Sequence, residues 1–172
     1  SRKTPKMKDI VMTPDPQHLR ALRDALGRFA TGVTIVTTTG PEGPMGFTAN
    51  SFASVSLDPA LVLWSPARSS SRFATFAAAK HYAIHILGRD QMPLIGRFAR
   101  GGAGFDGLDA AVNPEGVPLI PDALARFECE QHATHDGGDH LIVVGRVLRF
   151  AQTSGAPLVF SQGVYGGFEP AT

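Results

Sequence analysis

The sequence is poor in cysteine, in charge and in long apolar runs. Only one of its 172 residues is cysteine, so no intramolecular disulfide can form, and a lone thiol is typical of a reducing compartment. Charged residues make up 18% and the net charge is +1, which gives no basic surface for nucleic acid. No stretch approaches the roughly 18 uninterrupted apolar residues of a membrane helix, and the first residues lack the apolar run of a secretory signal. These absences predict a cytoplasmic protein that binds neither nucleic acid nor a membrane.

Glycine and proline are abundant instead. The chain has 19 glycines, 13 prolines and 43% hydrophobic residues, a composition that favours many turns and buried strands around one core. Residues 1–14 are polar, contain prolines and show no periodicity, so they predict a flexible arm. Residues 15–172 predict one domain.

A first helix is predicted after Asp15 and Pro16, which supply an N-cap and a first-turn proline. Four apolar residues at helical spacing predict one buried stripe: Leu19, Leu22, Leu26 and Phe29. The helix is predicted to end near Gly32.

Two shorter helices are predicted further along the chain. Serines 69–71 precede RFATFAAAK and can cap the first of them, on which Phe73, Phe76 and Ala77 share a face. Asp90 can cap the second, which reaches Phe98 and tolerates Pro93 in its first turn.

The remaining segments read as short strands. VTIVTTT (33–39) is rich in β-branched residues with period two, and the turn 40–44 leads to a return strand with Met45, Phe47 and Ala49 on one face. Further strands are predicted at 61–64, 81–87, on both sides of Asp136–Asp139, and at 157–160. Six or more short strands with three helices predict an antiparallel barrel with helical plugs. The irregular segment 100–122 is too long for a passive connector, so we expect it to lie over a site or a neighbouring subunit.

Several motifs fail in their context. Gly102, Gly104 and Gly107 match the dinucleotide pattern G-x-G-x-x-G, but a predicted helix precedes them where a buried strand is required. His81 and His85 would lie about 13 Å apart on a strand, too far for one metal ion. Thiolate and imidazole are the ligands that zinc prefers, and a second group offers four of them: Cys129, His132, His135 and His140. Strand alternation places Cys129 and His132 on opposite faces, which argues against a shared zinc ion.

SPARSSSR (65–72) admits two interpretations. Exposed N–H groups, serine hydroxyls and the guanidinium groups of Arg68 and Arg72 could form a phosphate cradle at a helix start. The other interpretation is an ordinary helix cap with a solvated loop.

Six segments in register resemble the flavin reductase-like family, the small reductase components of two-component flavin monooxygenases. They are FATGVTIVTT (29–38), GFTANSFASVSLDPALVLWSP (46–66), SSSRFATF (69–76), QMPLIGRFA (91–99), DGGDH (136–140) and PLVFSQGVYGGF (157–168). The resemblance covers about residues 19 to 168. It implies a mainly β fold, the FMN-binding split β-barrel with a few short helices, as a homodimer with flavin in a groove between the subunits.

The resemblance also implies which residues form the site. Those lining the isoalloxazine ring and ribityl chain would be Thr48, Ala49, Asn50 and Ser51. The rest of the flavin and its phosphate would be held by Ser65, Pro66, Ala67, Arg68 and Ser71. Two residues of the short helix, Phe98 and Ala99, would complete the pocket. The nicotinamide would be met by Asp139 and His140 after the glycine turn, with Tyr165 bordering the same opening.

The activity implied is that of an NAD(P)H:flavin oxidoreductase. Such an enzyme transfers a hydride from NADH or NADPH to FMN or FAD and supplies reduced flavin to a partner monooxygenase. Because the two cofactors carry the hydride themselves, the protein needs no nucleophile–base pair. Backbone N–H groups of 49–52 and 67–69 are candidates to stabilise negative charge on the reduced ring. His140 would position the nicotinamide or act as a weak proton donor; the other interpretation pairs it with Asp139 or solvent.

Two alternatives remain open at this point. A pyridoxamine-phosphate-oxidase-like protein would hold FMN tightly and act on another substrate, although the Gly-Asp-His turn argues against it. A non-catalytic flavin binder would consume no NADH when free flavin is added.

Overall fold

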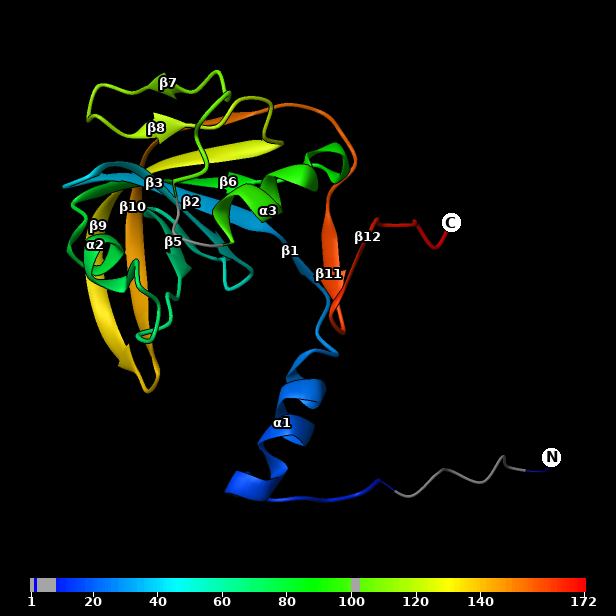
Figure 1. The fold of residues 1–172 in the computed structure, drawn as a ribbon. Helices are drawn as coiled ribbons and strands as arrows, with labels where there is room; N and C mark the ends of the chain where they lie inside the picture. Colours follow the sequence, from blue (N-terminus) through cyan, green and yellow to red (C-terminus); the bar gives the residue numbers. More distant parts are fainter. Residues whose placement is uncertain (1, 3–8, 100–102) are drawn as a thin grey trace.

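The computed structural model describes residues 2, 9–99 and 103–172, and it is mainly β, as predicted (Figure 1). Its strands are β1 (Thr31–Gly32), β2 (Thr34–Gly40), β3 (Gly43–Ala49), β4 (Ala53–Leu57), β5 (Ala60–Trp64), β6 (His81–Ile86), β7 (Ala111–Val112), β8 (Pro118–Leu119), β9 (Ala125–Gly137), β10 (His140–Gln152), β11 (Val159–Ser161) and β12 (Val164–Gly166). Within these ranges, a seven-stranded antiparallel sheet has the order β3-β2-β6-β9-β10-β5-β4. A three-stranded sheet, β1-β11-β12, and the pair β7-β8 accompany it. None of the helices in the described ranges is long and apolar enough to cross a bilayer.

The seven-stranded sheet curls around one core. Its two edge strands, β3 and β4, are joined by residues 50–52 alone, so their facing ends lie within about 14 Å of each other. Side chains from opposite halves of the sheet meet inside it: Phe47 of β3 packs edge to face on Trp64 of β5, with ring centroids 5.5 Å apart. Phe76, Tyr82 and Val143 complete this buried cluster with residues of the other central strands. The hydrophobic effect therefore favours the curled sheet over a flat one.

Strand β2 departs from the predicted alternation. Residues 33–38 are all buried, threonines included, because both faces of the strand are covered. The outer cover is the segment 103–122, which we call the strap. Thr37 donates its hydroxyl proton to the carbonyl of Pro118 at 2.6 Å, and Thr39 donates to that of Gly116 at 2.6 Å. Part of the segment predicted to lie over a site or a neighbouring subunit thus covers this chain's own sheet, while residues 100–102 fall outside the described ranges.

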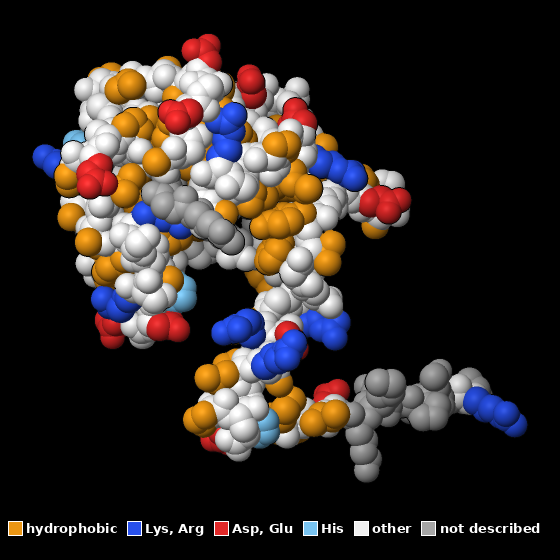
Figure 2. All heavy atoms as spheres, in the orientation of Figure 1, with side chains coloured by type: hydrophobic (Ala, Val, Ile, Leu, Met, Phe, Trp, Pro, Cys, Tyr) orange, Lys and Arg blue, Asp and Glu red, His pale blue; other side chains and the backbone are white. Residues whose placement is uncertain are grey.

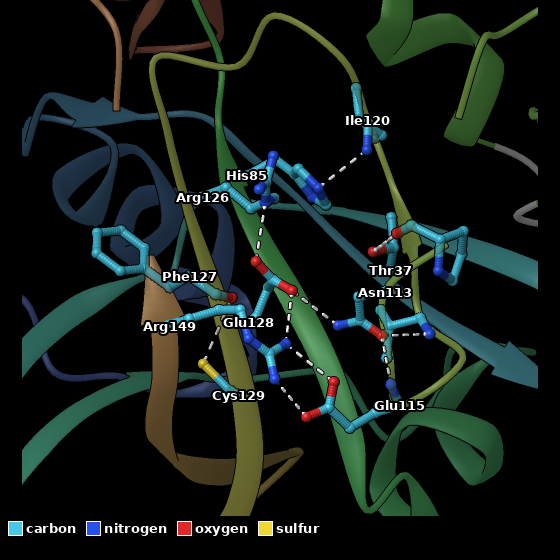
Figure 3. Close-up of polar contacts among 12 residues, drawn as sticks. Thr37, His85, Asn113, Glu115, Ile120, Arg126, Phe127, Glu128, Cys129 and Arg149 are labelled. Carbon is cyan, nitrogen blue, oxygen red and sulfur yellow. Dashed lines mark hydrogen bonds and ion pairs between the residues drawn. The ribbon is translucent and has the colours of Figure 1, made fainter. Parts of the chain in front are cut away.

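Charged side chains attach the strap to the sheet (Figure 3). Glu128 of β9 is buried and accepts hydrogen bonds from Asn113 at 3.0 Å and from Arg149 of β10 at 2.8 Å. The same guanidinium also donates to both carboxylate oxygens of Glu115, at 2.6 and 2.9 Å. These bonds lower the pKa of the Glu115 carboxyl, and the same arginine, with Asn113, lowers that of Glu128 against the opposing effect of burial. One arginine therefore joins the strap to a buried carboxylate of the sheet.

His85 of β6 forms a second attachment behind the strap. Its ring is fully buried; Nδ1 lies 2.9 Å from the carbonyl oxygen of Ile35, and the N–H of Ile120 donates to Nε2 at 3.0 Å. Burial lowers the pKa of His85 to about 4. The ring is therefore neutral at pH 7, with Nδ1 as donor and Nε2 as acceptor.

The first helix forms, but its apolar stripe is not buried. After a 3-10 turn, η1 (Pro16–His18), α1 spans Leu19–Leu26 and ends well before Gly32. Asp15 makes no side-chain capping bond. The stripe residues Leu19, Leu22, Leu26 and Phe29 are exposed by 52, 40, 67 and 78%. Figure 1 shows α1 standing apart from the sheet, and Figure 2 shows its hydrophobic side chains at the surface with open space between helix and body. The buried stripe predicted from the sequence has no cover in the described part of this chain.

The two shorter helices lie close to their predicted positions. Helix α2 spans Phe73–Ala78, and α3 spans Pro93–Phe98 after the 3-10 turn η2 (Arg89–Gln91), with Pro93 in the first turn as predicted. The predicted caps are wrong, since neither a serine nor Asp90 makes a side-chain bond to the start of a helix. Ser70 instead accepts from the N–H of Arg72 in a local turn. Residues 1 and 3–8 of the arm predicted over residues 1–14 lie outside the described residues.

Candidate functional site

The predicted flavin segments after β3 and β5 meet through one hydroxyl. The N–H of Ser65 donates to Ser51 Oγ at 2.8 Å, which joins the residue after β5 to the short link between β3 and β4. Ala49, at the end of β3, is held from its other side by the Thr34 hydroxyl, which donates to its carbonyl at 2.7 Å. The Ser51 hydroxyl therefore holds the start of the segment 65–68 against the end of the segment 48–51.

Main-chain bonds bring the predicted nicotinamide segment to the same place. The N–H of Leu141 donates to the carbonyl of Pro66 at 3.1 Å, and that of Arg68 donates to the carbonyl of Asp139 at 2.9 Å. Ala67 and His140 thus face each other as a β-bridge. The Arg68 N–H is already used in this ladder, so it is not a free donor for a reduced flavin ring, contrary to our expectation for 67–69.

His140 begins β10, directly after the two-residue turn of the β9–β10 hairpin. Gly138 in this turn has φ of +73°, which favours glycine. The half-exposed imidazole of His140 has Nδ1 2.7 Å from Asp139 Oδ1. This hydrogen bond lowers the pKa of the Asp139 carboxyl, which is therefore ionised at neutral pH and accepts the Nδ1 proton. The arrangement leaves Nε2 of His140 as the nitrogen that can face a ligand.

A small pocket lies beside the end of β3. It has a volume of about 220 Å³ and is lined by Val33, Thr48, Ala49, Asn50, Phe160 and Tyr165. Tyr165 of β12 packs on Phe160 with ring centroids 4.8 Å apart. The Thr48 hydroxyl oxygen is buried and has no hydrogen-bond partner in the described part of the chain. A buried hydroxyl without a partner is unfavourable unless a ligand or water satisfies it, so this pocket fits a polar ligand edge.

Arg68 is held by the hairpin. Its Nε–H donates to the Gly138 carbonyl at 3.0 Å, and Nη2 pairs with Asp136 at 2.8 Å. Ser71 is exposed at the surface nearby. With its charge paired and only a six-residue helix behind it, the predicted phosphate cradle around Arg68 has less free positive charge than the sequence suggests.

Phe98 and Ala99 occupy different environments. The Phe98 ring is fully buried against Gly46 and Phe105, so only the backbone of this residue can face a ligand, whereas Ala99 is exposed. Between this helix end and β3 lies Arg72, whose Nη1 donates to the carbonyl of Phe98 at 2.6 Å and to that of Gly46 at 2.9 Å. Arg72, which the sequence suggests only as a phosphate ligand, thus borders the site. Val33 and Phe160 also line the pocket, and nothing in their sequence context distinguishes them from core residues.

The histidines and the cysteine do not form a metal centre. Across residues 9–99 and 103–172, no group of three or more His, Cys, Asp or Glu side chains could hold one ion. Cys129 is buried, which raises the pKa of its thiol to about 12, while His132 and His135 of the same strand are exposed. His81 and His85 lie on strand β6, and the two ring nitrogens of His85 are both hydrogen-bonded to the backbone. The glycine pattern follows helix α3, with Gly102 outside the described residues.

A curled antiparallel sheet with a polar surface at one end, framed by main-chain hydrogen bonds, fits a β protein that holds a cofactor, and the cofactor would then supply the reactive group. Comparison with known protein families makes the class specific. The model of the flavin reductase-like domain matches residues 26–169. The chain belongs to this family, which confirms the resemblance seen in its sequence.

Individual relatives agree with this assignment. The chain is 60% identical over 158 residues to the FMN reductase (NADH) SmoA of Agrobacterium fabrum, covering 92% of this chain and 91% of that protein. It is 47% identical to the reductase component of the flavin-dependent trigonelline monooxygenase of Acinetobacter baylyi over 89% of this chain, and spans 49% of that longer protein. Among solved structures, the NADH:FAD oxidoreductase of Streptomyces globisporus in complex with NAD and FAD fragments has a TM-score of 0.85 at 36% identity, covering 94% of this chain and 99% of that one.

Proposed function

We propose that this protein is an NADH-dependent flavin reductase that transfers a hydride from NADH to FMN or FAD. The observation that carries the proposal is that hydrogen bonds join the segments 48–51, 65–68 and 139–141. The Ser51 hydroxyl accepts from the N–H of Ser65, and main-chain bonds link residues 66–68 to residues 139–141. A relative of 60% identity and nearly equal length is an FMN reductase that uses NADH, which supports the same activity here.

The described residues fit a flavin. The unpartnered Thr48 hydroxyl can bond to a carbonyl or ring nitrogen of the isoalloxazine edge, beside Ala49 and Asn50 in the pocket wall. Tyr165 offers an aromatic surface at the same opening. We place the ribityl chain along Thr48–Ser51 as well, and the rest of the flavin with its phosphate along residues 65–68 and Ser71, with Ala99 and the backbone of Phe98 at the border.

When bound, flavin accepts the hydride at its N5 atom and takes up negative charge near N1. The protein's part is to align the two rings and exclude water between them, because a hydride moves only between closely placed atoms. We assign His140 to the nicotinamide side, with Asp139 fixing its ring through Nδ1 so that Nε2 can donate or accept a hydrogen bond. Free N–H groups in 49–52 remain candidates to stabilise the reduced ring.

We further propose that the sheet forms a split β-barrel and that the site is completed in a homodimer. The Thr48 pocket, at about 220 Å³, is smaller than the roughly 300 Å³ at the lower limit of typical ligand sites, so a further wall is needed. The exposed stripe of α1 needs a cover as well, because a contiguous apolar surface on a small domain usually marks an interface. A second subunit would supply both.

The reduced flavin is proposed to serve a partner monooxygenase. A relative at 47% identity is the reductase component of such an enzyme, which supports this role. We place the protein in the cytoplasm, where its lone Cys129 would stay reduced.

Steady-state oxidation of each nicotinamide in the presence of each flavin tests the proposed activity directly. We expect NADH to be consumed continuously when FMN or FAD is added, with oxygen reoxidising the product. A protein that binds flavin but consumes no NADH would be a flavin binder, and one that neither binds nor reduces flavin would overturn the proposal. Titration of free flavin during turnover then shows whether flavin dissociates between cycles.

A further inference from the structure

The side chain of Arg72 bonds at once to strand β3, just before the proposed ring-binding segment 48–51, and to the end of α3. It follows the serine segment 65–71, and its Nη1 donates to the carbonyl of Gly46, two residues before Thr48, and to that of Phe98, next to Ala99. Both acceptors are main-chain atoms. The guanidinium therefore fixes the end of α3 against β3 from the start of α2.

The charge of Arg72 has a defined environment. Its guanidinium carbon lies 4.6 Å from the centre of the Phe47 ring, and none of the ion pairs formed in the described part of the chain includes it. Its Nε–H is buried without a partner in that part of the chain. Burial without a carboxylate lowers the pKa of this arginine, so keeping it here costs free energy of desolvation. The Phe47 face and the carbonyl at the helix end offset part of that cost.

We propose that Arg72 is a positioning residue for flavin binding, which sets the distance between the Thr48–Ser51 wall and the end of α3. This inference rests on the proposed flavin site. A planar guanidinium can donate from one nitrogen to two carbonyls while stacking on a ring, whereas the compact ammonium of lysine at the same place cannot reproduce that geometry. Because Nη1 of Arg72 bonds to two main-chain carbonyls, we expect it to act through the ring-binding wall, and direct contact with the phosphate is the competing outcome of the test.

The substitutions Arg72→Gln and Arg72→Lys test this role by comparing FMN with riboflavin, which lacks the phosphate. Dissociation constants are measured by quenching of flavin fluorescence without nicotinamide. Loss of a charge-assisted pair of hydrogen bonds in Arg72→Gln should weaken binding of FMN and of riboflavin about tenfold, by the same factor for both. The two dissociation constants of Arg72→Lys should lie between those of Arg72→Gln and those of the wild type. In turnover, the KM for flavin should rise, while the KM for NADH stays within about twofold.

Arg146→Gln is the matched control. Arg146 is an exposed arginine of β10 that pairs with Glu130 at 2.9 Å, so its loss should leave both dissociation constants unchanged. Thermal unfolding separates positioning from stability, because partial unfolding lowers kcat through the active fraction and leaves KM unaltered. If Arg72→Gln fails to fold, the dissociation constants of Arg72→Lys for FMN and riboflavin test the inference in its place.

Two results would overturn the inference. Weakened binding of FMN with unchanged riboflavin would show that Arg72 contacts the phosphate directly. Unchanged binding of both flavins in a folded variant would show that the two carbonyl bonds are dispensable. Either result in an enzyme that still reduces flavin leaves the proposed function intact, whereas wild-type protein that reduces no flavin contradicts that function instead.

Discussion

The imidazole of His140 is oriented by Asp139, its neighbour in the hairpin turn. The carboxylate takes one imidazole nitrogen at 2.7 Å and leaves the other facing outward. This orientation combines the two interpretations of His140 that the sequence leaves open, because pairing with Asp139 and contact with a nicotinamide use different ring nitrogens.

Replacing His140 with alanine should therefore slow hydride transfer and spare flavin binding. We expect single-turnover flavin reduction to fall by about tenfold to a hundredfold, because the nicotinamide loses its positioning contact, with a change of about twofold or less in the flavin dissociation constant. Stopped-flow absorbance of the flavin measures the rate of reduction, and fluorescence titration measures the flavin dissociation constant. His135→Ala, an exposed histidine on β9 near the same hairpin, serves as the control and should alter neither. Full-rate reduction by His140→Ala would remove its proposed role.

His85 makes stability depend on pH. Its pKa is about 4 in the folded protein and about 6.5 in the unfolded chain, so the unfolded state holds more protons between these values. The free energy of unfolding should fall as the pH is lowered from about 6.5 to about 4, by about 3 kcal/mol from this residue. The charged neighbours Arg126 and Glu128 modify the pKa of His85, the first lowering and the second raising it. Because the pKa of the Glu128 carboxyl is also lowered, protonation of Glu128 costs further stability when the pH falls below its ordinary value of 4.5.

Urea unfolding at several pH values measures this effect. His85→Gln should show a flatter dependence than the wild type between pH 6.5 and 4.5, since glutamine does not titrate. Equal slopes for the two proteins would mean that His85 is already protonated when folded.

The turn at Gly138-Asp139 and the end of β5 at Trp64 were predictable because they depend on local sequence pattern. Which residues meet the flavin was implied by the family resemblance alone and stays a prediction. The role of Arg72 was not predictable, because its partners are carbonyls 26 residues away on either side, and backbone acceptors leave no trace in the sequence. The complete burial of the Phe98 ring has a similar origin, since it depends on Gly46, far away in the chain.

At the scale of elements, the pair β9–β10 carries two arginine–glutamate contacts of similar chemistry in different surroundings. Arg149 faces the buried Glu128 and also Glu115 of the strap, whereas Arg146 meets Glu130 near the surface. Of these two arginine–glutamate contacts, only that of Arg149 also attaches the strap to the sheet.

Arg149→Met should lower the free energy of unfolding roughly threefold more than Arg146→Met does. The first substitution leaves a buried carboxylate without its main cation, and the second removes a solvated pair. Urea denaturation of both variants checks the ratio, and hydrogen exchange in residues 111–120 should accelerate in Arg149→Met alone. Equal destabilisation would mean that the strap is held mainly by the threonine bonds from Thr37 and Thr39.

Element types were more predictable than their burial. Helix α1 lies where its spacing predicts, and its stripe is exposed because amphipathic spacing requires an apolar partner without saying which chain supplies it. The alternation expected in β2 fails for a related reason, because the strap covers the face that would otherwise meet water. Serine-rich helix starts also permit a turn such as the one at Ser70, so composition alone does not decide the cap.

At the scale of the whole molecule, the exposed stripe of α1 is where we expect subunits to meet. Leu26→Glu places a charge in the middle of that surface and should convert a dimer into monomers, as measured by light scattering after size exclusion. Arg20→Gln, which changes the charge by the same amount on the polar face, should leave the dimer intact. Flavin affinity should fall together with dimerisation if the second subunit completes the Thr48 pocket. A Leu26→Glu protein that stays dimeric would place the interface elsewhere.

The ladder between residues 66–68 and 139–141 has a consequence for how this site can diverge. Its geometry is set by carbonyl and amide groups that every amino acid possesses, so side chains at Ala67 or His140 can be exchanged without dismantling the frame. If flavin and nicotinamide bind here as proposed, substitutions at these two positions change the contacts to the ligands and leave the main-chain frame that positions them in place.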